Sequence, residues 1–162
     1  MTDQTVVCVV IPVYGVEPYL DHCIRSVVEQ DYERLDIVVV DDGSPDDCPQ
    51  MCDEWAARDP RIRVVHKKNG GLASARNAGL DVIVGDVVTF VDSDDYVLYH
   101  GLDEMVRRIE QDGSDLVIAG FDHLYFGQKI EKLPHTNACI ELRSSYEDLK
   151  QLYKGGFLNM PW

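Results

Sequence analysis

The sequence contains few basic residues for its acidic content, with 15 lysines and arginines against 29 aspartates and glutamates. The resulting formal charge of -14 opposes attachment to a nucleic-acid backbone or to an anionic lipid surface. We therefore expect no nucleic-acid partner. A ligand that carries phosphate would need local neutralisation by a metal cation or by a few placed basic groups, because the overall field repels it.

Long apolar runs are also missing. No run of about 18 apolar residues occurs, and the N-terminus lacks a basic segment followed by an apolar stretch and a cleavage site. We expect no transmembrane segment and no secretion signal. The five cysteines form no regular framework, which favours reduced, buried thiols and a cytoplasmic location. Cys48 and Cys52 are four residues apart, but no second Cys or His pair follows at zinc-site spacing.

Short apolar runs rich in β-branched residues predict strands at residues 6–11, 35–40, 62–65, 87–91 and 116–119. The runs hardly alternate, which is typical of strands covered on both faces. Segments with helical spacing lie between them, with apolar faces at Leu20, Cys23, Ile24, Val27 and Val28, then at Leu72, Ala75, Ala78 and Leu80, and then at Leu102, Met105, Val106 and Ile109. The alternation predicts an α/β fold with a mostly parallel central sheet and helices on both faces.

The pattern changes beyond Gly120, where aromatic and charged residues mix and indicate a strand-and-loop excursion. Ser144 and Glu147 fit a capping box that opens a short helix through Tyr153. The length suits one domain, which we divide into a core at residues 1–120 and a second region at residues 121–162.

Polar clusters follow four of the predicted strands. In open α/β sheets ligands bind beyond the carboxyl ends of the strands, so these clusters are expected at one edge. The clusters are Pro12-Val13-Tyr14-Gly15, Asp41-Asp42-Gly43-Ser44, Asn69-Gly70-Gly71 and Asp92-Ser93-Asp94-Asp95. Together they predict a composite ligand site.

The last cluster holds three carboxylates within four residues. Such crowding costs free energy unless a positive charge lies among them, and Mg²⁺ or Mn²⁺ takes carboxylate oxygens together with substrate phosphates and water. The alternative interpretation is an acidic turn that caps the next helix. One Asp would satisfy that turn, so the metal site is favoured.

Other residues have equally open interpretations when taken singly. Asp42 could accept hydrogen bonds from a nucleobase or ribose, or could form an Asx-type turn. Arg76 could pair with a diphosphate, or with a carboxylate in a surface ion pair. Tyr14 could stack on a base or serve only in packing. No Ser-His-Asp or Cys-His arrangement supports a hydrolase, and the five histidines are scattered, most of them expected at the surface or at helix termini.

The four clusters in this order, with the segment Gly-Leu-Ala-Ser-Ala-Arg-Asn-Ala-Gly at residues 71–79, resemble the family 2 glycosyltransferases. The resemblance covers residues 6 to about 118. It implies an inverting enzyme of the Rossmann-like GT-A nucleotide-sugar-binding fold. It also implies a nucleotide-diphospho-sugar donor, commonly a UDP-sugar, bound with Mn²⁺ or Mg²⁺.

The resemblance further implies roles for individual residues. Asp42 would accept from the base, Asp92 would contact ribose or metal, and Asp94 would be the principal metal ligand. Asp95 would help to position the sugar. The remaining residues expected at the nucleotide-sugar site are Pro12, Val13, Tyr14, Glu17, Asp41, Arg76 and Ser93.

The resemblance is incomplete in two ways. Relatives often carry a Pro four residues beyond the acidic cluster, where this chain has Tyr99. The acceptor-activating base is expected beyond Trp162, with residues 121–162 as the truncated start of the acceptor-side region. That missing part could attach the protein to the inner face of the membrane.

The expected function is sugar transfer to a glycan or lipid-linked acceptor in bacterial cell-surface polysaccharide biosynthesis. Two alternatives stay open. A sugar-nucleotide nucleotidyltransferase also combines an α/β sheet with a carboxylate-held metal, but should have a Gly-rich basic loop after its first strand, which this sequence lacks. A nucleotide-binding domain without turnover is the other.

Overall fold

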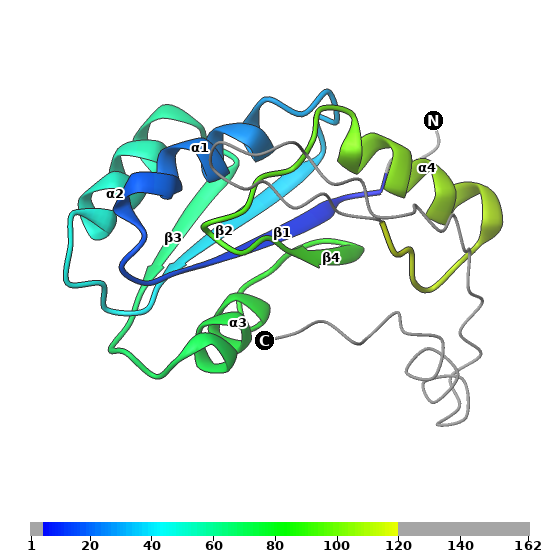
Figure 1. Ribbon diagram of the computed structural model, residues 1–162. Helices are drawn as coiled ribbons and strands as arrows, with labels where there is room; N and C mark the ends of the chain where they lie inside the picture. Colours follow the sequence, from blue (N-terminus) through cyan, green and yellow to red (C-terminus); the bar gives the residue numbers. More distant parts are fainter. Residues whose placement is uncertain (1–4, 120–162) are drawn as a thin grey trace, which may run out of the picture. The chain divides into compact units, whose positions relative to one another are not determined.

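A computed structural model of the chain describes residues 5–119. Four strands alternate with helices along the chain (Figure 1). The elements in order are β1 (Val7–Val13), α1 (Glu17–Val28), β2 (Leu35–Asp41), α2 (Cys48–Arg58), β3 (Ile62–His66), α3 (Leu72–Leu80), β4 (Val87–Phe90) and α4 (Gly101–Asp112).

The four strands form one sheet in the order β3-β2-β1-β4, and every pairing in it is parallel. The register sets Val13 beside Asp41, and Asp41 beside His66. Because all four strands run the same way, the segments that follow them leave from one edge. The predicted meeting of the polar clusters at that edge follows from this topology.

Helices cover both faces of the sheet, as predicted. Helices α1 and α2 lie on one face and α3 lies on the other (Figure 1). Helix α2 packs on β2 and β3 and against α1, while α3 packs on β1 and β2. All seven residues of β1 are buried, which is why its sequence shows no alternation of apolar and polar residues.

Local sequence explains the helices that flank the site. Helix α1 has Pro18 in its first turn and Arg25 in its last, and the predicted apolar face is buried at four of its five positions. Helix α2, which we did not predict as a separate element, buries only Cys48 and Cys52 on its length. The four-residue spacing of these two thiols therefore marks a helix face, and both are free.

One predicted strand is wrong. Residues 116–119 have no regular secondary structure. A run of four apolar residues becomes a strand only by hydrogen bonding to a neighbour, and within residues 5–119 no strand pairs with it.

The chain divides into two compact units, Met1–Asp103 and Glu104–Trp162. All four strands belong to the first unit. The predicted boundary at residue 120 lies directly beyond the last described residue. The predicted capping-box helix lies outside the described residues. Within residues 5–119, no helix is long and apolar enough to cross a membrane.

Close packing of α3 on β1 leads to a stability prediction. A Cβ atom at Gly79 would lie 2.4 Å from Cγ1 of the fully buried Val10. We expect Gly79→Val to lower the free energy of unfolding by about 2–3 kcal/mol through overpacking. Ala73→Val, at an exposed position of the same helix, is the matched control and should cost under about 1 kcal/mol. Urea denaturation measures both, and equal stability of the two variants would contradict the close approach.

Candidate functional site

A cavity of about 380 Å³ lies at the carboxyl edge of the sheet, in the first unit. Residues from all four predicted clusters and from the start of α3 line it: Pro12, Val13, Tyr14, Asp42, Gly71, Leu72, Ala75, Asp92, Ser93 and Asp94. Seven of these are predicted site residues. The predicted site residues Glu17, Asp41, Arg76 and Asp95 are not among the lining residues.

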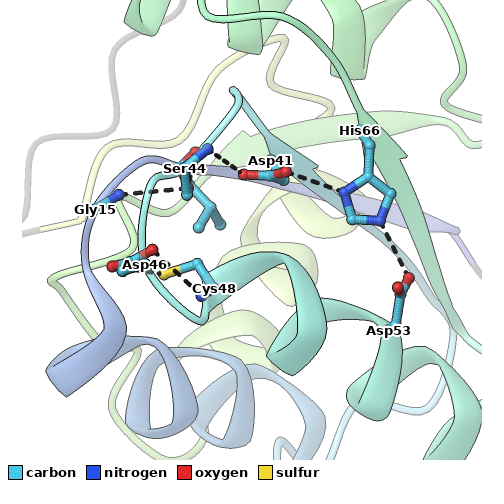
Figure 2. A network of polar contacts seen from close by, with 8 residues as sticks. Gly15, Asp41, Ser44, Asp46, Cys48, Asp53 and His66 are labelled. Atoms are coloured by element: carbon cyan, nitrogen blue, oxygen red, sulfur yellow. Dashed lines mark hydrogen bonds and ion pairs between the residues drawn. The ribbon is translucent and has the colours of Figure 1, made fainter.

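The end of β1 supplies one wall of the cavity. Pro12 and Val13 are buried, whereas Tyr14 is 52% exposed and its ring is therefore available to a ligand. The turn after Tyr14 is joined to the β2 end, since the Gly15 amide donates to Ser44 Oγ at 3.4 Å (Figure 2). The predicted contact residue Glu17 is exposed on α1, and its carboxylate accepts from the Asp47 amide at 3.5 Å.

Asp42 is almost fully buried, with 2% of its surface exposed. Its carboxylate accepts from the amides of Gly70, at 3.0 and 3.1 Å, and of Gly71, at 2.7 Å, and it pairs with the Lys67 ammonium. Burial opposes its charge, but the hydrogen bonds from Lys67, Gly70 and Gly71 outweigh burial and lower its pKa. Asp42 therefore holds the loop at residues 67–71 in addition to lining the cavity.

Glycine is required where this loop passes the β2 end. Gly43 has φ +73°, and a Cβ there would lie 3.0 Å from the Asn69 amide nitrogen and 3.1 Å from the Lys67 carbonyl oxygen. Both neighbours are backbone atoms, so neither can rotate away. The sequence signal for this close contact between the two backbone segments is the Asp-Asp-Gly-Ser order itself.

Asp41 and Asp42 have different surroundings. Asp41 accepts from the Ser44 amide at 2.9 Å and contacts His66 Nδ1 at 3.0 Å, and His66 Nε2 lies 3.1 Å from Asp53 on α2 (Figure 2). Asp41 is buried and is used for these protein contacts. Asp41 was predicted beside the nucleotide pocket. In this geometry it supports the neighbouring residues and does not line the cavity.

The acidic cluster follows β4. Asp92, Ser93 and Asp94 line the cavity, while the Asp95 amide donates to the Asp92 carbonyl at 2.9 Å and closes the turn. Arg76, one turn into α3, pairs with Asp92 at 2.6 Å and lies over the Phe90 ring at 5.4 Å. Of the two interpretations of Arg76, the structure contains the ion pair.

A buried thiol lies beneath this cluster. Cys23 on α1 donates to the Asp92 carbonyl oxygen at a sulfur–oxygen distance of 3.6 Å. Burial raises the pKa of this thiol to about 12, and the charges of Asp95, Asp94 and Asp92 add to the effect. All three carboxylates therefore lie close enough to Cys23 to oppose its ionisation.

The donor set suits a hard divalent cation. Asp92 and Asp94 line one cavity, and Asp94 is exposed. Within residues 5–119 no group of three or more His, Cys, Asp or Glu residues could by itself hold a metal ion. Mg²⁺ and Mn²⁺ sites commonly use one or two carboxylates and complete the shell with phosphates and water, so two carboxylates fit such an ion.

Sequence reasoning missed two basic residues next to the site, His66 and Lys67. His66 is the last residue of β3 and Lys67 follows it, and each contacts one carboxylate at the end of β2. A signal was present, because a basic pair at the end of one strand complements an acidic pair at the end of its neighbour. Finding it required the strand order β3-β2.

Comparison with known proteins gives consistent results. The family model described as glycosyl transferase family 2 matches residues 8–160. The chain is 40% identical to the uncharacterized glycosyltransferase EpsJ of Bacillus subtilis, over 96% of this chain and 46% of EpsJ. It is 36% identical to the glycosyltransferase GlyG of Streptococcus pneumoniae, over 71% of this chain and 38% of GlyG. The chain thus spans less than half the length of both relatives.

Solved structures agree on the fold. S. aureus TarS 1-349 in complex with UDP-GlcNAc is 32% identical with a TM-score of 0.64, over 68% of this chain and 32% of that one. The mannosyltransferase PcManGT from Pyrobaculum calidifontis, in complex with GDP-Man and Mn²⁺, is 28% identical with a TM-score of 0.64. That match covers 70% of this chain and 34% of the other. The predicted GT-A type of α/β fold is confirmed.

Proposed function

The chain belongs to glycosyl transferase family 2, and on that premise we propose that it binds the nucleotide-diphospho-sugar donor of an inverting glycosyltransferase, with a UDP-sugar as the donor class. One observation carries the proposal. The aromatic end of β1, the buried carboxylate of Asp42 and the carboxylates of Asp92 and Asp94 line a single cavity. A lining that combines apolar residues with acidic groups suits a nucleoside diphosphate bound with a cation.

The roles follow from this arrangement. Tyr14 stacks on the base, which Pro12 and Val13 enclose. The diphosphate lies toward Asp94, close to Gly71 and the first turn of α3, whose amides favour anions. Asp94 and Asp92 hold Mn²⁺ or Mg²⁺, a cation that stabilises negative charge on a departing diphosphate. Complexes of neighbours with UDP-GlcNAc, and with GDP-Man and Mn²⁺, support this assignment.

The proposed reaction is a single displacement. An acceptor hydroxyl, from a glycan or a lipid-linked sugar, loses its proton to a general base and attacks the anomeric carbon. The bond from that carbon to the diphosphate oxygen breaks on the opposite face, and its electron pair leaves with the nucleoside diphosphate. Within this chain the described residues bind and orient the donor; the position of the base stays a prediction. Cell-surface polysaccharide synthesis is the proposed setting.

The two alternative functions differ from this one in measurable ways. A nucleotidyltransferase would form or cleave the phosphate–phosphate bond of a nucleotide-diphospho-sugar. A binding domain would leave the donor unchanged. Incubation with a donor labelled in the sugar separates them, because transfer or slow hydrolysis releases nucleoside diphosphate and labelled sugar. The turn at residues 12–17 has no Gly-rich basic loop for a triphosphate, which weighs against the nucleotidyltransferase.

The first test is nucleotide binding with and without metal. We expect calorimetric titration with UDP to give an affinity at least about 100-fold higher in Mn²⁺ than in chelator, because the protein charge repels an unneutralised diphosphate. GDP and TDP in the same titration measure the preference for the base. Equal affinity in Mn²⁺ and in chelator would remove the metal from the proposal, and no binding of any nucleotide would reject the proposed function.

A further inference from the structure

His66 lies between two carboxylates that come from different elements. Its Nδ1 atom is 3.0 Å from Asp41 at the end of β2, and its Nε2 atom is 3.1 Å from Asp53 on α2 (Figure 2). A neutral imidazole has only one N–H group, so it can donate to one of these partners while a lone pair faces the other. Only the imidazolium form donates to both. The geometry therefore favours the charged ring.

The charges around His66 agree with this geometry. Hydrogen bonds to Asp41 and then to Asp53 raise the pKa of His66, and they outweigh the opposing effect of burial. Burial opposes the charge of Asp41, yet the hydrogen bonds from His66 and Ser44 lower its pKa. Helix α2 also brings Cys52 near the two carboxylates, but burial raises the pKa of that thiol to about 12, so it stays neutral. The neighbouring Lys67 pairs with Asp42.

The network is connected to the cavity through Ser44. Asp41 accepts from the Ser44 amide at 2.9 Å, and Ser44 Oγ lies 3.4 Å from the Gly15 amide and 3.5 Å from the Val13 carbonyl oxygen. These two backbone groups flank Tyr14, and Asp42 is the residue after Asp41. A shift of Asp41 would therefore move Tyr14 and Asp42, the cavity-lining residues that directly follow β1 and β2.

We propose that the Asp41–His66–Asp53 network is a positioning device for the donor site, and that it holds Tyr14 and Asp42 in place only while His66 is protonated. His66 is a positioning residue, since it does not line the cavity. The inference rests on the proposed function, because it assumes that a donor binds in that cavity. It predicts that donor affinity depends on pH through a group outside the binding surface.

The direction of the dependence follows from the sign of the shift. The His66 pKa is higher in the folded protein than in the unfolded chain, so its contribution to stability is full below the ordinary pKa of about 6.5. That contribution is lost as the pH rises through the raised value. Donor affinity should weaken over the same window, and Asp41, whose pKa is lowered, stays ionised throughout it.

The test measures the affinity of the whole chain for UDP-GlcNAc with Mn²⁺ by calorimetry, from about pH 6 to about pH 8.5. This probe is chosen because both its phosphates are esterified and keep a constant charge over that range. We expect wild-type affinity to fall about 5- to 10-fold across the range, as part of one charge-assisted contact is lost. His66→Gln should bind weakly at every pH, with no such fall.

Two further variants sharpen the test. Asp53→Asn removes one carboxylate at an exposed position, so the midpoint of the affinity change should move to lower pH while the low-pH affinity is retained. His22→Gln removes an exposed histidine of α1 that lies outside the network and should follow the wild-type profile. An NMR titration of the His66 ring in the wild type tests the charge directly, even where His66→Gln does not fold.

The outcomes separate the inference from the proposed function. A wild-type affinity that is flat across the range, a His66→Gln variant that keeps the wild-type profile, or a His66 ring that titrates below its ordinary pKa would overturn the inference. Failure of both UDP and UDP-GlcNAc to bind the wild type at any pH would instead reject the proposed function.

Discussion

Replacing Asp94 by alanine is expected to remove the metal-dependent part of nucleotide binding, with a loss in UDP affinity of at least about 100-fold and an unchanged fold. Loss of a group that only supports a metal ligand costs about 10- to 100-fold, so loss of the ligand itself should reach at least the upper end. Asp92 cannot fully compensate, because its carboxylate is already paired with Arg76 at 2.6 Å. Asp94 is exposed, so its removal should leave the core intact.

Calorimetry of UDP binding in Mn²⁺ and in chelator measures the loss, and the electron paramagnetic resonance signal of free Mn²⁺ reports metal binding independently of any turnover. Asp81→Ala is the matched control. It removes one negative charge, as Asp94→Ala does, but at the exposed C-terminal end of α3, whereas the cavity is lined by the N-terminal end of that helix. The control should bind UDP like the wild type. An Asp94→Ala variant that unfolds would favour the structural acidic turn over the metal site.

Asp42→Ala is expected to lower the free energy of unfolding by about 2–4 kcal/mol. The substitution leaves the Lys67 ammonium and the amides of Gly70 and Gly71 without their shared acceptor, and breaking a buried ion pair by removing one partner costs about 3–5 kcal/mol. Lys67 is 20% exposed and can recover some hydration, which sets the lower expectation. Lys67→Met and the double variant complete a mutant cycle that isolates the pair.

The stabilisation by Asp42 should also depend on pH in the opposite sense to that of His66. The pKa of Asp42 is lowered in the folded protein, so its contribution is present above the ordinary value of about 4 and is lost as the pH falls through the lowered one. Urea denaturation of the wild type and of Asp42→Ala at several acidic pH values should therefore show converging stabilities. A constant difference would contradict the assigned contacts.

Nucleotide binding distinguishes the loop contact of Asp42 from the base contact predicted by the resemblance. Uracil has an N3–H donor and cytosine does not. If Asp42 accepts from the base, Asp42→Ala should weaken UDP binding by about 1.5–3 kcal/mol and CDP binding much less. If Asp42 acts through the loop at residues 67–71, both nucleotides should lose equally. The four protein hydrogen bonds to its carboxylate favour the second result.

Much of the architecture was predictable because it depends on local patterns. Strands β1 to β4 begin within one residue of their predicted positions, since continuous β-branched runs are typical of strands covered on both faces. Parallel strands then bring their carboxyl ends to one edge, and this alone predicted that Tyr14, Asp42 and Asp94 would meet. Helix α2 was missed because only Cys48 and Cys52 of its residues are buried, which leaves a short apolar pattern.

Sequence alone therefore determined the α/β alternation, the edge at which the site lies and the acidic residues suited to a cation. Tertiary structure decided which charged side chains pair with one another. Asp41 and Asp42 are adjacent carboxylates that no pattern distinguishes, because successive side chains of extended backbone point to opposite sides and only packing decides which side faces the ligand. Packing of α2 and β3 turned Asp41 to His66, and the loop after β3 brought Lys67 to Asp42. Arg76 and Asp92, 16 residues apart, were paired by α3 and β4.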